Sequence, residues 1–186
     1  HGLEADMFWW TYQDADLSPA WVMANAGYDV WLGNNRGTRW SLGHTTLNKN
    51  QEAFWDWDWE EMGTLDTPKV IDYILYKTGH KKINYMGHSE GTTQIMAGAS
   101  LMPDFYKEKI NVCIFMAPPA AMTHNSIGIF ELMAIPVNRA IITSIVETIG
   151  LYSILPWNYL TSEAAGIFCD IFDGYLCNLV MSIFVD

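Results

Sequence analysis

The spacing of apolar positions changes repeatedly between residues 66 and 116. After a helix start at Asp66-Thr67-Pro68, apolar residues fall on one helical face until Gly79. A short apolar run at 83–86 comes next, and residues 92–102 are good helix formers until Pro103 stops them. Residues 110–116, INVCIFM, are typical of a buried strand. The pattern predicts helix, strand, helix and strand in succession.

The same alternation begins earlier in the chain. Residues 18–25 predict a helix with Ser18 as N-cap and Pro19 in its first turn. The run Tyr28–Leu32, YDVWL, predicts a strand bounded by turns. Helix and strand then alternate three times, which indicates parallel strands joined by right-handed crossovers and therefore an α/β fold.

The pattern changes near residue 120. Apolar residues recur at helical spacing through residues 137–149, with polar residues on the other side, and no clear strand follows. We therefore expect an α/β core over 1–120 and a helical region over 121–186.

Composition argues against nucleic-acid binding and against a membrane-spanning protein. The 186 residues are 50% hydrophobic, and the formal net charge is -11. The ten Lys and Arg are scattered, so no nucleic-acid partner is expected. Polar residues interrupt every apolar run before it reaches about 18 residues, so no transmembrane segment is expected.

The three cysteines lack the spacing of a metal site, so no zinc site is expected. No cofactor is predicted either. Cys113 lies in an apolar run and is predicted to be a small core residue. Cys169 and Cys177 are near enough in sequence to form a disulfide in an oxidising compartment, although nothing in the sequence requires one.

The five residues GHSEG, with Ser89 at their centre, stand between an apolar run and a helix-like segment. Serine needs geometry and a base to become a nucleophile, and a tight strand-to-helix turn holds its oxygen at the positive end of a helix. Gly87 and Gly91 fit because larger side chains would collide where helix and strand converge. The pattern predicts a nucleophile elbow, and the alternative is an ordinary serine in a glycine-flanked turn.

The first residues, HGLEAD, offer a partner for this serine. An N–H after a His-Gly turn, together with the N–H of the residue after the nucleophile, commonly forms an oxyanion hole. We therefore expect Leu3 and Glu90 to supply these two donors.

Several longer stretches, taken in order, resemble one known family. They are HGL, ANAGYDVWLGNNRGTRWS, FWDWDWEEMGTLDTPKVIDYIL, INYMGHSEGTTQ and IFMAPPA, which cover residues 1 to about 120. Together they resemble the acid lipases of the α/β-hydrolase fold, which include gastric and lysosomal acid lipases. FCDIFDGYLCN is similar, more loosely, to the cysteine-bearing part of that family's cap domain.

The resemblance implies a partial α/β-hydrolase fold with the start of a helical cap or lid. It also implies a serine carboxylic ester hydrolase acting on lipid esters such as acylglycerols or steryl esters, with Ser89 as nucleophile and Leu3 and Glu90 at the oxyanion hole. A secreted or lysosomal location and peripheral contact of the cap with a lipid interface would follow from the same resemblance.

Two features depart from the family pattern. Glutamine is usual where this chain has Glu90, so we expect that carboxylate to point to solvent while its N–H does the work. Met7 and Phe8 stand where small serines often follow HGL.

The triad acid and base are not identifiable after Ser89. His124 is the only later histidine and lies directly past a strand, and none of Asp104, Asp170, Asp173 and Asp186 has a suitable setting. In the family both groups follow the cap, so we expect a fragment with little or no activity by itself.

Some alternatives stay open at this stage. The chain is either an ester hydrolase or a non-catalytic lipid-binding or interaction protein that keeps the fold, and thioester cleavage is a third possibility. The aromatic stretch Phe54–Trp59 is either structural or a substrate platform. Arg36 is expected to hydrogen-bond loop carbonyls, and the 137–149 run either contacts lipid or packs on the core.

Overall fold

The computed structural model describes residues 1–121 and 128–148. The chain divides into two units, His1–Ala120 and Ala121–Asp186, and each is described by itself. Assignment of the second unit as a cap stays a prediction.

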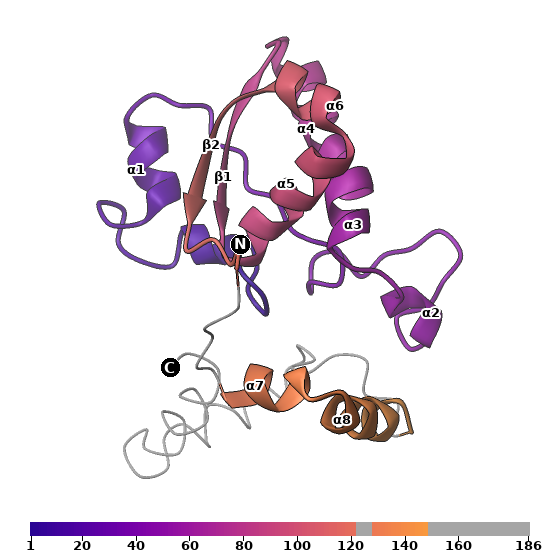
Figure 1. Cartoon of the computed structure of the whole chain (residues 1–186). Helices are drawn as coiled ribbons and strands as arrows, with labels where there is room; N and C mark the ends of the chain where they lie inside the picture. The colour runs from indigo at the N-terminus through magenta and orange to yellow at the C-terminus, as the bar shows by residue number, and fades with distance from the viewer. Residues whose placement is uncertain (122–127, 149–186) are drawn as a thin grey trace. The chain divides into compact units, whose positions relative to one another are not determined.

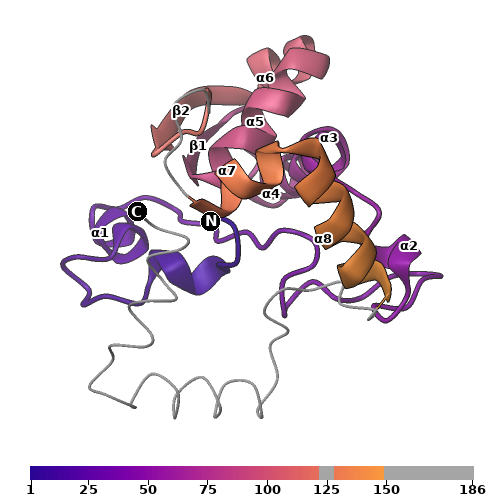
Figure 2. The same ribbon diagram turned by 60° about the horizontal axis from the view of Figure 1, so that its bottom comes forward.

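Two parallel strands form the sheet of the first unit. β1 (Ile83–His88) pairs with β2 (Ile110–Met116), with Met86 opposite Ile114 and His88 opposite Met116. Helices α5 (Glu90–Leu101) and α6 (Pro103–Lys109) connect them. Figure 1 shows α4, α5 and α6 on one side of the strands and α1 on the other, and Figure 2 gives a second direction. The predicted parallel crossover is confirmed, although Pro103 begins α6 as well as ending the predicted helix.

The helix before β1 is longer than its sequence signals indicate. α3 (Trp59–Glu61), the π-helix η2 (Met62–Asp66) and α4 (Thr67–Thr78) follow one another without a break. α4 ends at Gly79, which has a φ of 73°. The predicted helix start at Asp66-Thr67-Pro68 matches the start of α4, with Pro68 in its first turn, although Asp66 is itself in helical conformation and its carboxylate is paired with Arg36 instead of capping.

Close helix packing sets the core of this unit. A Cβ on Gly63 of η2 would lie 2.6 Å from the backbone N of Gly98 in α5, so the two backbones touch. The Tyr106 hydroxyl donates to the Gly63 carbonyl across the same junction, and burial raises the pKa of Tyr106 to about 12. Ile71 and Ile95 are almost fully buried beside it.

The first 58 residues contain only short helices: η1 (Met7–Trp10), α1 (Pro19–Asn25) and α2 (Glu52–Trp55). The predicted helix at 18–25 is confirmed, with Pro19 at its first position. Ser18 is the N-cap by position, but its hydroxyl donates to the carbonyl of Gln13.

The strand predicted at Tyr28–Leu32 is wrong, since no strand is assigned there. A strand requires a hydrogen-bonded neighbour. Instead, a cavity of about 430 Å³ lies between residues 28–35, α4 and residues 83–86 of β1. Residues 28–32 therefore have a strand-like composition but no neighbouring strand with which to form hydrogen bonds.

β2 is less buried than its sequence indicates. Six of its seven residues are exposed, including Cys113, so the prediction of a core cysteine is wrong. Within the described residues β2 pairs with β1 alone, and apolar side chains of β2 are exposed.

The second unit contributes α7 (Gly128–Ala134) and α8 (Pro136–Thr148), and α8 confirms the predicted helical periodicity. Val137, Ile141 and Ile145, four residues apart, are each more than half exposed. No helix within residues 1–121 and 128–148 has the length and apolar character to cross a bilayer. Cys169 and Cys177 lie outside the described residues.

Candidate active site

Ser89 occupies a sharp turn between β1 and α5. Its φ of 49° and ψ of -115° are unusual for any residue with a side chain. The Ser89 N–H donates to the Met116 carbonyl at 2.9 Å, which fixes the turn to the end of β2. Its own carbonyl accepts from the N–H of Thr92 at 2.8 Å and from the Thr92 hydroxyl at 2.7 Å. The strained conformation is held from both sides, as residues with functional strain commonly are.

Crowding at this turn accounts for its glycines. A Cβ on Gly87 would lie 2.6 Å from the Gly91 carbonyl oxygen, where β1 meets α5. A Cβ on Gly91 would lie 3.0 Å from the His1 oxygen, and one on Gly2 would lie 3.3 Å from Ser89 Cβ. The first two residues of the chain therefore lie directly against the serine turn.

Hydrogen bonds lock that first segment in place. The Gly91 N–H donates to the His1 carbonyl at 3.1 Å. The His1 ring accepts the Asn35 N–H at Nε2, 3.1 Å away, so its Nδ1 carries the proton and donates to the Gly2 carbonyl at 3.0 Å. The Ala5 N–H closes a tight turn onto the Gly2 carbonyl, with Glu4 at a φ of 57°.

Two backbone donors remain available beside Ser89. Within the described residues, neither the Leu3 N–H nor the Glu90 N–H has a hydrogen-bond acceptor. Both belong to segments that touch the serine turn, and Glu90 is the first residue of α5, where helix N–H groups are normally unsatisfied. Unused N–H groups of this kind can donate hydrogen bonds to an oxygen that carries negative charge.

The Glu90 carboxylate is anchored, which corrects the expectation that it points freely to solvent. Asn35 Nδ2 donates to one oxygen at 3.4 Å, and Trp59 Nε1 donates to the other at 3.2 Å. The side chain is half-buried between them. Two donors from different segments hold it because a carboxylate offers two acceptor oxygens.

His88 has a packing role. Its ring stacks on Trp9 with centroids 4.9 Å apart, and its buried Nδ1 has no partner among the described residues. Burial lowers the pKa of His88. The ring therefore favours the neutral form.

No general base is positioned at Ser89 by the described residues. The Ser89 hydroxyl makes no hydrogen bond there, His1 is occupied with Asn35 and Gly2, and His44 and His80 are exposed. Asp104 lies in the first turn of α6, whereas His124, Asp170, Asp173 and Asp186 lie outside the described residues. In residues 1–121 and 128–148, no cluster of His, Cys, Asp or Glu could hold a metal ion.

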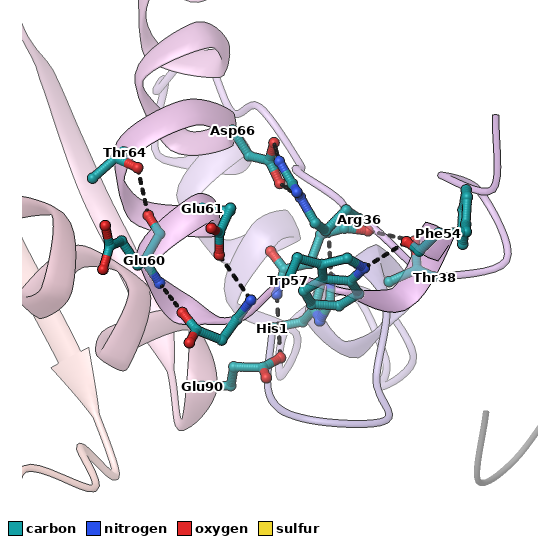
Figure 3. A network of polar contacts seen from close by, with 12 residues as sticks. His1, Arg36, Thr38, Phe54, Trp57, Glu60, Glu61, Thr64, Asp66 and Glu90 are labelled. Carbon is teal, nitrogen blue, oxygen red and sulfur yellow. Dashed lines mark hydrogen bonds and ion pairs between the residues drawn. The ribbon is translucent and has the colours of Figure 1, made fainter. Parts of the chain in front are cut away.

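Arg36 has a structural role, but not through loop carbonyls as the sequence suggests. Its guanidinium makes a bidentate pair with Asp66, at 2.5 and 2.6 Å, and lies 5.8 Å from the Trp57 ring centre (Figure 3). The hydrogen bonds to Asp66 raise the pKa of Arg36. This pair ties the loop after residue 33 to the start of α4.

Sequence reasoning missed the roles of Asn35 and Trp59 at the site. Trp59 belongs to the aromatic stretch, whose Phe54 is buried, and its indole N–H is used on Glu90. Asn35 lies 55 residues from Glu90 in the chain. The one local signal was Glu90 itself, because a carboxylate at this position of the motif needs hydrogen-bond donors.

Comparison with known proteins agrees with this geometry. The family described as alpha/beta hydrolase fold matches residues 1–137. The human lysosomal acid lipase/cholesteryl ester hydrolase is 38% identical over 136 residues, which cover 73% of this chain and 34% of that protein. Human lipase member N is 38% identical over 152 residues, covering 82% and 37%, respectively.

A probable lipase from Schizosaccharomyces pombe is 42% identical over 122 residues, covering 65% of this chain and 27% of the relative. The chain thus spans about a third of the length of these curated relatives. The predicted resemblance to the acid lipases is confirmed by these similarities. With a family match over 137 of 186 residues, the chain belongs to the α/β-hydrolase fold family, as an acid-lipase-like member.

Proposed function

We propose that this chain carries the nucleophile and oxyanion hole of a serine carboxylic ester hydrolase that acts on lipid esters. The observation that carries the proposal is the strained Ser89 turn, with unused N–H groups of Leu3 and Glu90 on the segments packed against it. Strain of this kind needs compensation, and presentation of a nucleophile is a common reason to keep it.

The chemistry would proceed in two stages. Ser89 Oγ attacks the ester carbonyl as a base removes its proton, and the carbonyl oxygen takes on negative charge that the two N–H groups stabilise. The alcohol then leaves with a proton, and water releases the acid from the acyl-serine. The acid and base of the triad are expected from residues other than the described ones, so the present stretch alone should hydrolyse little ester.

Lipid esters are the proposed substrates because the relatives include lipases and a protein named as a cholesteryl ester hydrolase. The exposed stripe Val137, Ile141 and Ile145 on α8 supports a surface that meets lipid. The proposed location, secreted or lysosomal, rests on the same relationship.

The direct test uses the protein expressed from its complete reading frame. Ser89→Ala should lower the hydrolysis rate of a short-chain nitrophenyl ester by at least about a thousandfold and abolish labelling by a fluorophosphonate. Ser100→Ala is the matched control, because Ser100 is exposed on the same helix and its hydroxyl only donates to the Ala97 carbonyl. Equal rates for Ser89→Ala and wild type would exclude the proposal.

A non-catalytic lipid-binding protein that keeps the fold is the second candidate, and the exposed stripe Val137, Ile141 and Ile145 on α8 supports it as well, because lipid contact needs no catalytic triad. In that case the complete protein would bind vesicles or lipid esters, while wild type and Ser89→Ala would both be inert toward the ester and the fluorophosphonate.

A further inference from the structure

The two proposed oxyanion donors lie on segments that are far apart in the sequence. The Leu3 N–H belongs to the turn from Gly2 to Ala5, and the Glu90 N–H belongs to the first residue of α5. Two donors stabilise one oxygen only when both N–H groups point at the same place, within about 2.7–3.1 Å of it. The spacing between the two segments therefore has to be set by contacts that reach both of them.

The adjacent residues Asn34 and Asn35 hold the first of these segments on both sides of Leu3. The Asn35 N–H donates to His1 Nε2 at 3.1 Å. The Met7 N–H donates to Asn34 Oδ1 at 2.9 Å. Because His1 and Met7 lie on either side of Leu3 in the sequence, these two bonds fix where the segment lies without using the Leu3 N–H.

The side chain of Asn35 reaches the second segment. Its Nδ2 donates to Glu90 Oε2 at 3.4 Å, and Trp59 Nε1 donates to Glu90 Oε1 at 3.2 Å. Both bonds act on the residue whose own N–H is the proposed oxyanion donor. Asn35 is therefore bonded to both segments, to the first through its backbone N–H and to the second through its side-chain amide.

The loop that carries Asn35 is itself fixed to the core. The N–H and the hydroxyl of Thr38 donate to the Asn35 carbonyl at 3.3 and 3.0 Å. The next residue, Arg36, makes its bidentate pair with Asp66 of η2 (Figure 3). η2 in turn packs on α5 at Gly63, where a Cβ would meet the backbone of α5. The loop, η2 and α5 thus form a closed set of contacts, and Asn35 joins this set to the first segment of the chain.

We propose that Asn35 is a positioning residue of the oxyanion hole, which sets the spacing between the N–H groups of Leu3 and Glu90. It acts on Glu90 through the carboxylate of that residue, with Trp59 as the second donor to the same group. This inference rests on the proposed function of Ser89. In this scheme Asn35 touches no reacting atom, and its effect is on the direction of the two N–H groups.

The test compares kcat and KM of wild type, Asn35→Ala and Trp59→Phe for a short-chain nitrophenyl ester, in the protein expressed from its complete reading frame. Oxyanion donors act mainly in the transition state, so a misdirected N–H lowers kcat and leaves KM nearly unchanged. Loss of a whole donor costs about a hundred- to a thousandfold in kcat. For a donor that is displaced but present, we expect kcat to fall about five- to thirtyfold in Asn35→Ala and about two- to fivefold in Trp59→Phe.

The same two substitutions in a Glu90→Ala background test whether both residues act through the carboxylate. Asn35→Ala keeps the backbone N–H that binds the His1 ring and removes only the bond to Glu90. Once the carboxylate is gone, adding either Asn35→Ala or Trp59→Phe should therefore change kcat by less than about twofold. A merely structural role would lower the free energy of unfolding in either background and leave kcat of the folded protein unchanged.

Inhibition by a phenylboronic acid gives a second readout. Its adduct with Ser89 is a tetrahedral anion, which needs the same donors as the transition state. The inhibition constant should rise in Asn35→Ala by about the factor by which kcat/KM falls.

Two matched variants control for the loss of an amide and of an indole N–H. Asn111→Ala removes an exposed Nδ2 that donates to Asn84, and Trp31→Phe removes an indole N–H that donates to the carboxylate of Asp29. Both should leave kcat and KM within about twofold of wild type.

Unchanged kcat in both Asn35→Ala and Trp59→Phe would overturn the positioning role, and so would undiminished effects of these substitutions in the Glu90→Ala background. Far-UV circular dichroism checks that each variant is folded. Should Asn35→Ala fail to fold, Trp59→Phe still decides, because it keeps a ring at a half-exposed position and removes a donor to the same carboxylate. Activity that survives Ser89→Ala would instead refute the proposed function, so the two failures are distinguishable.

Discussion

The two sides of β1 differ in how far the chain covers them. Toward α5 and η2, glycine backbones touch, and Ile71, Ile95 and Met62 are almost fully buried. Toward β2 and residues 28–32, apolar side chains such as Ile114 and Trp31 are about 40% exposed. Large apolar residues occur on both sides, so burial here depends on the presence of a neighbour and not on hydrophobicity alone.

The largest effect should come from the glycine junction on the packed side. Gly63→Ala places a Cβ within 2.6 Å of Gly98 N, and backbone cannot yield as a flexible side chain can. We expect a loss of about 3 kcal/mol or more in the free energy of unfolding, measured by urea denaturation. Gly33→Ala, at a position with open space around it, should change this free energy by less than about 0.5 kcal/mol. Equal effects would remove the contrast between the two sides.

The same substitution at two isoleucines tests the difference between the two sides with a smaller change in volume. Ile71→Val removes one methylene from a site that is 1% exposed and should cost about 1 kcal/mol of unfolding free energy. Ile114→Val removes the same group from β2, where the residue is 40% exposed, and should cost much less. A cost at residue 114 as large as that at residue 71 would mean that β2 is covered in the folded protein.

The smallest effect concerns His88 at the end of β1. Because its folded pKa is below the ordinary 6.5, mainly through burial, the unfolded chain binds the proton more tightly. The free energy of unfolding that neutral His88 contributes is fully present above pH 6.5 and is lost as pH falls through the folded pKa. The ring is partly exposed, so we expect less than about 1 kcal/mol between pH 7.5 and 5.

His88→Phe keeps an aromatic ring against Trp9 and should lose this part of the pH dependence, as measured by thermal unfolding at the two pH values. His80→Asn, at an exposed position, should retain it. Retention of the full pH dependence in His88→Phe would assign it to another group.

Elements whose signals are local could be predicted from the sequence. The end of α4 at Gly79, the start of α1 at Pro19 and both strands follow from spacing and from glycine and proline placement. The outcome at residues 28–32 could not be predicted from local signals, because a strand forms only where another strand is available to pair with it. The same limit explains why the exposure of Cys113 was missed.

The candidate site also combines residues that local motifs identify with contacts that only the folded chain makes. Ser89, its glycines and the nearby N–H donors lie in short motifs, so the sequence pointed to them directly. The anchoring of Glu90 by Asn35 and Trp59 joins three segments that only folding brings together. Asp66 illustrates the competition involved, since an apparent helix cap is used as the partner of Arg36.

The cavity beside β1 has a practical consequence for anyone who handles this stretch alone. Within the described residues β1 pairs only with β2, and a strand with unsatisfied N–H and C=O groups beside apolar walls recruits strands from other molecules. Concentration-dependent aggregation is therefore the expected failure during purification, and a charged residue introduced along residues 28–32 would be a rational solubilising change.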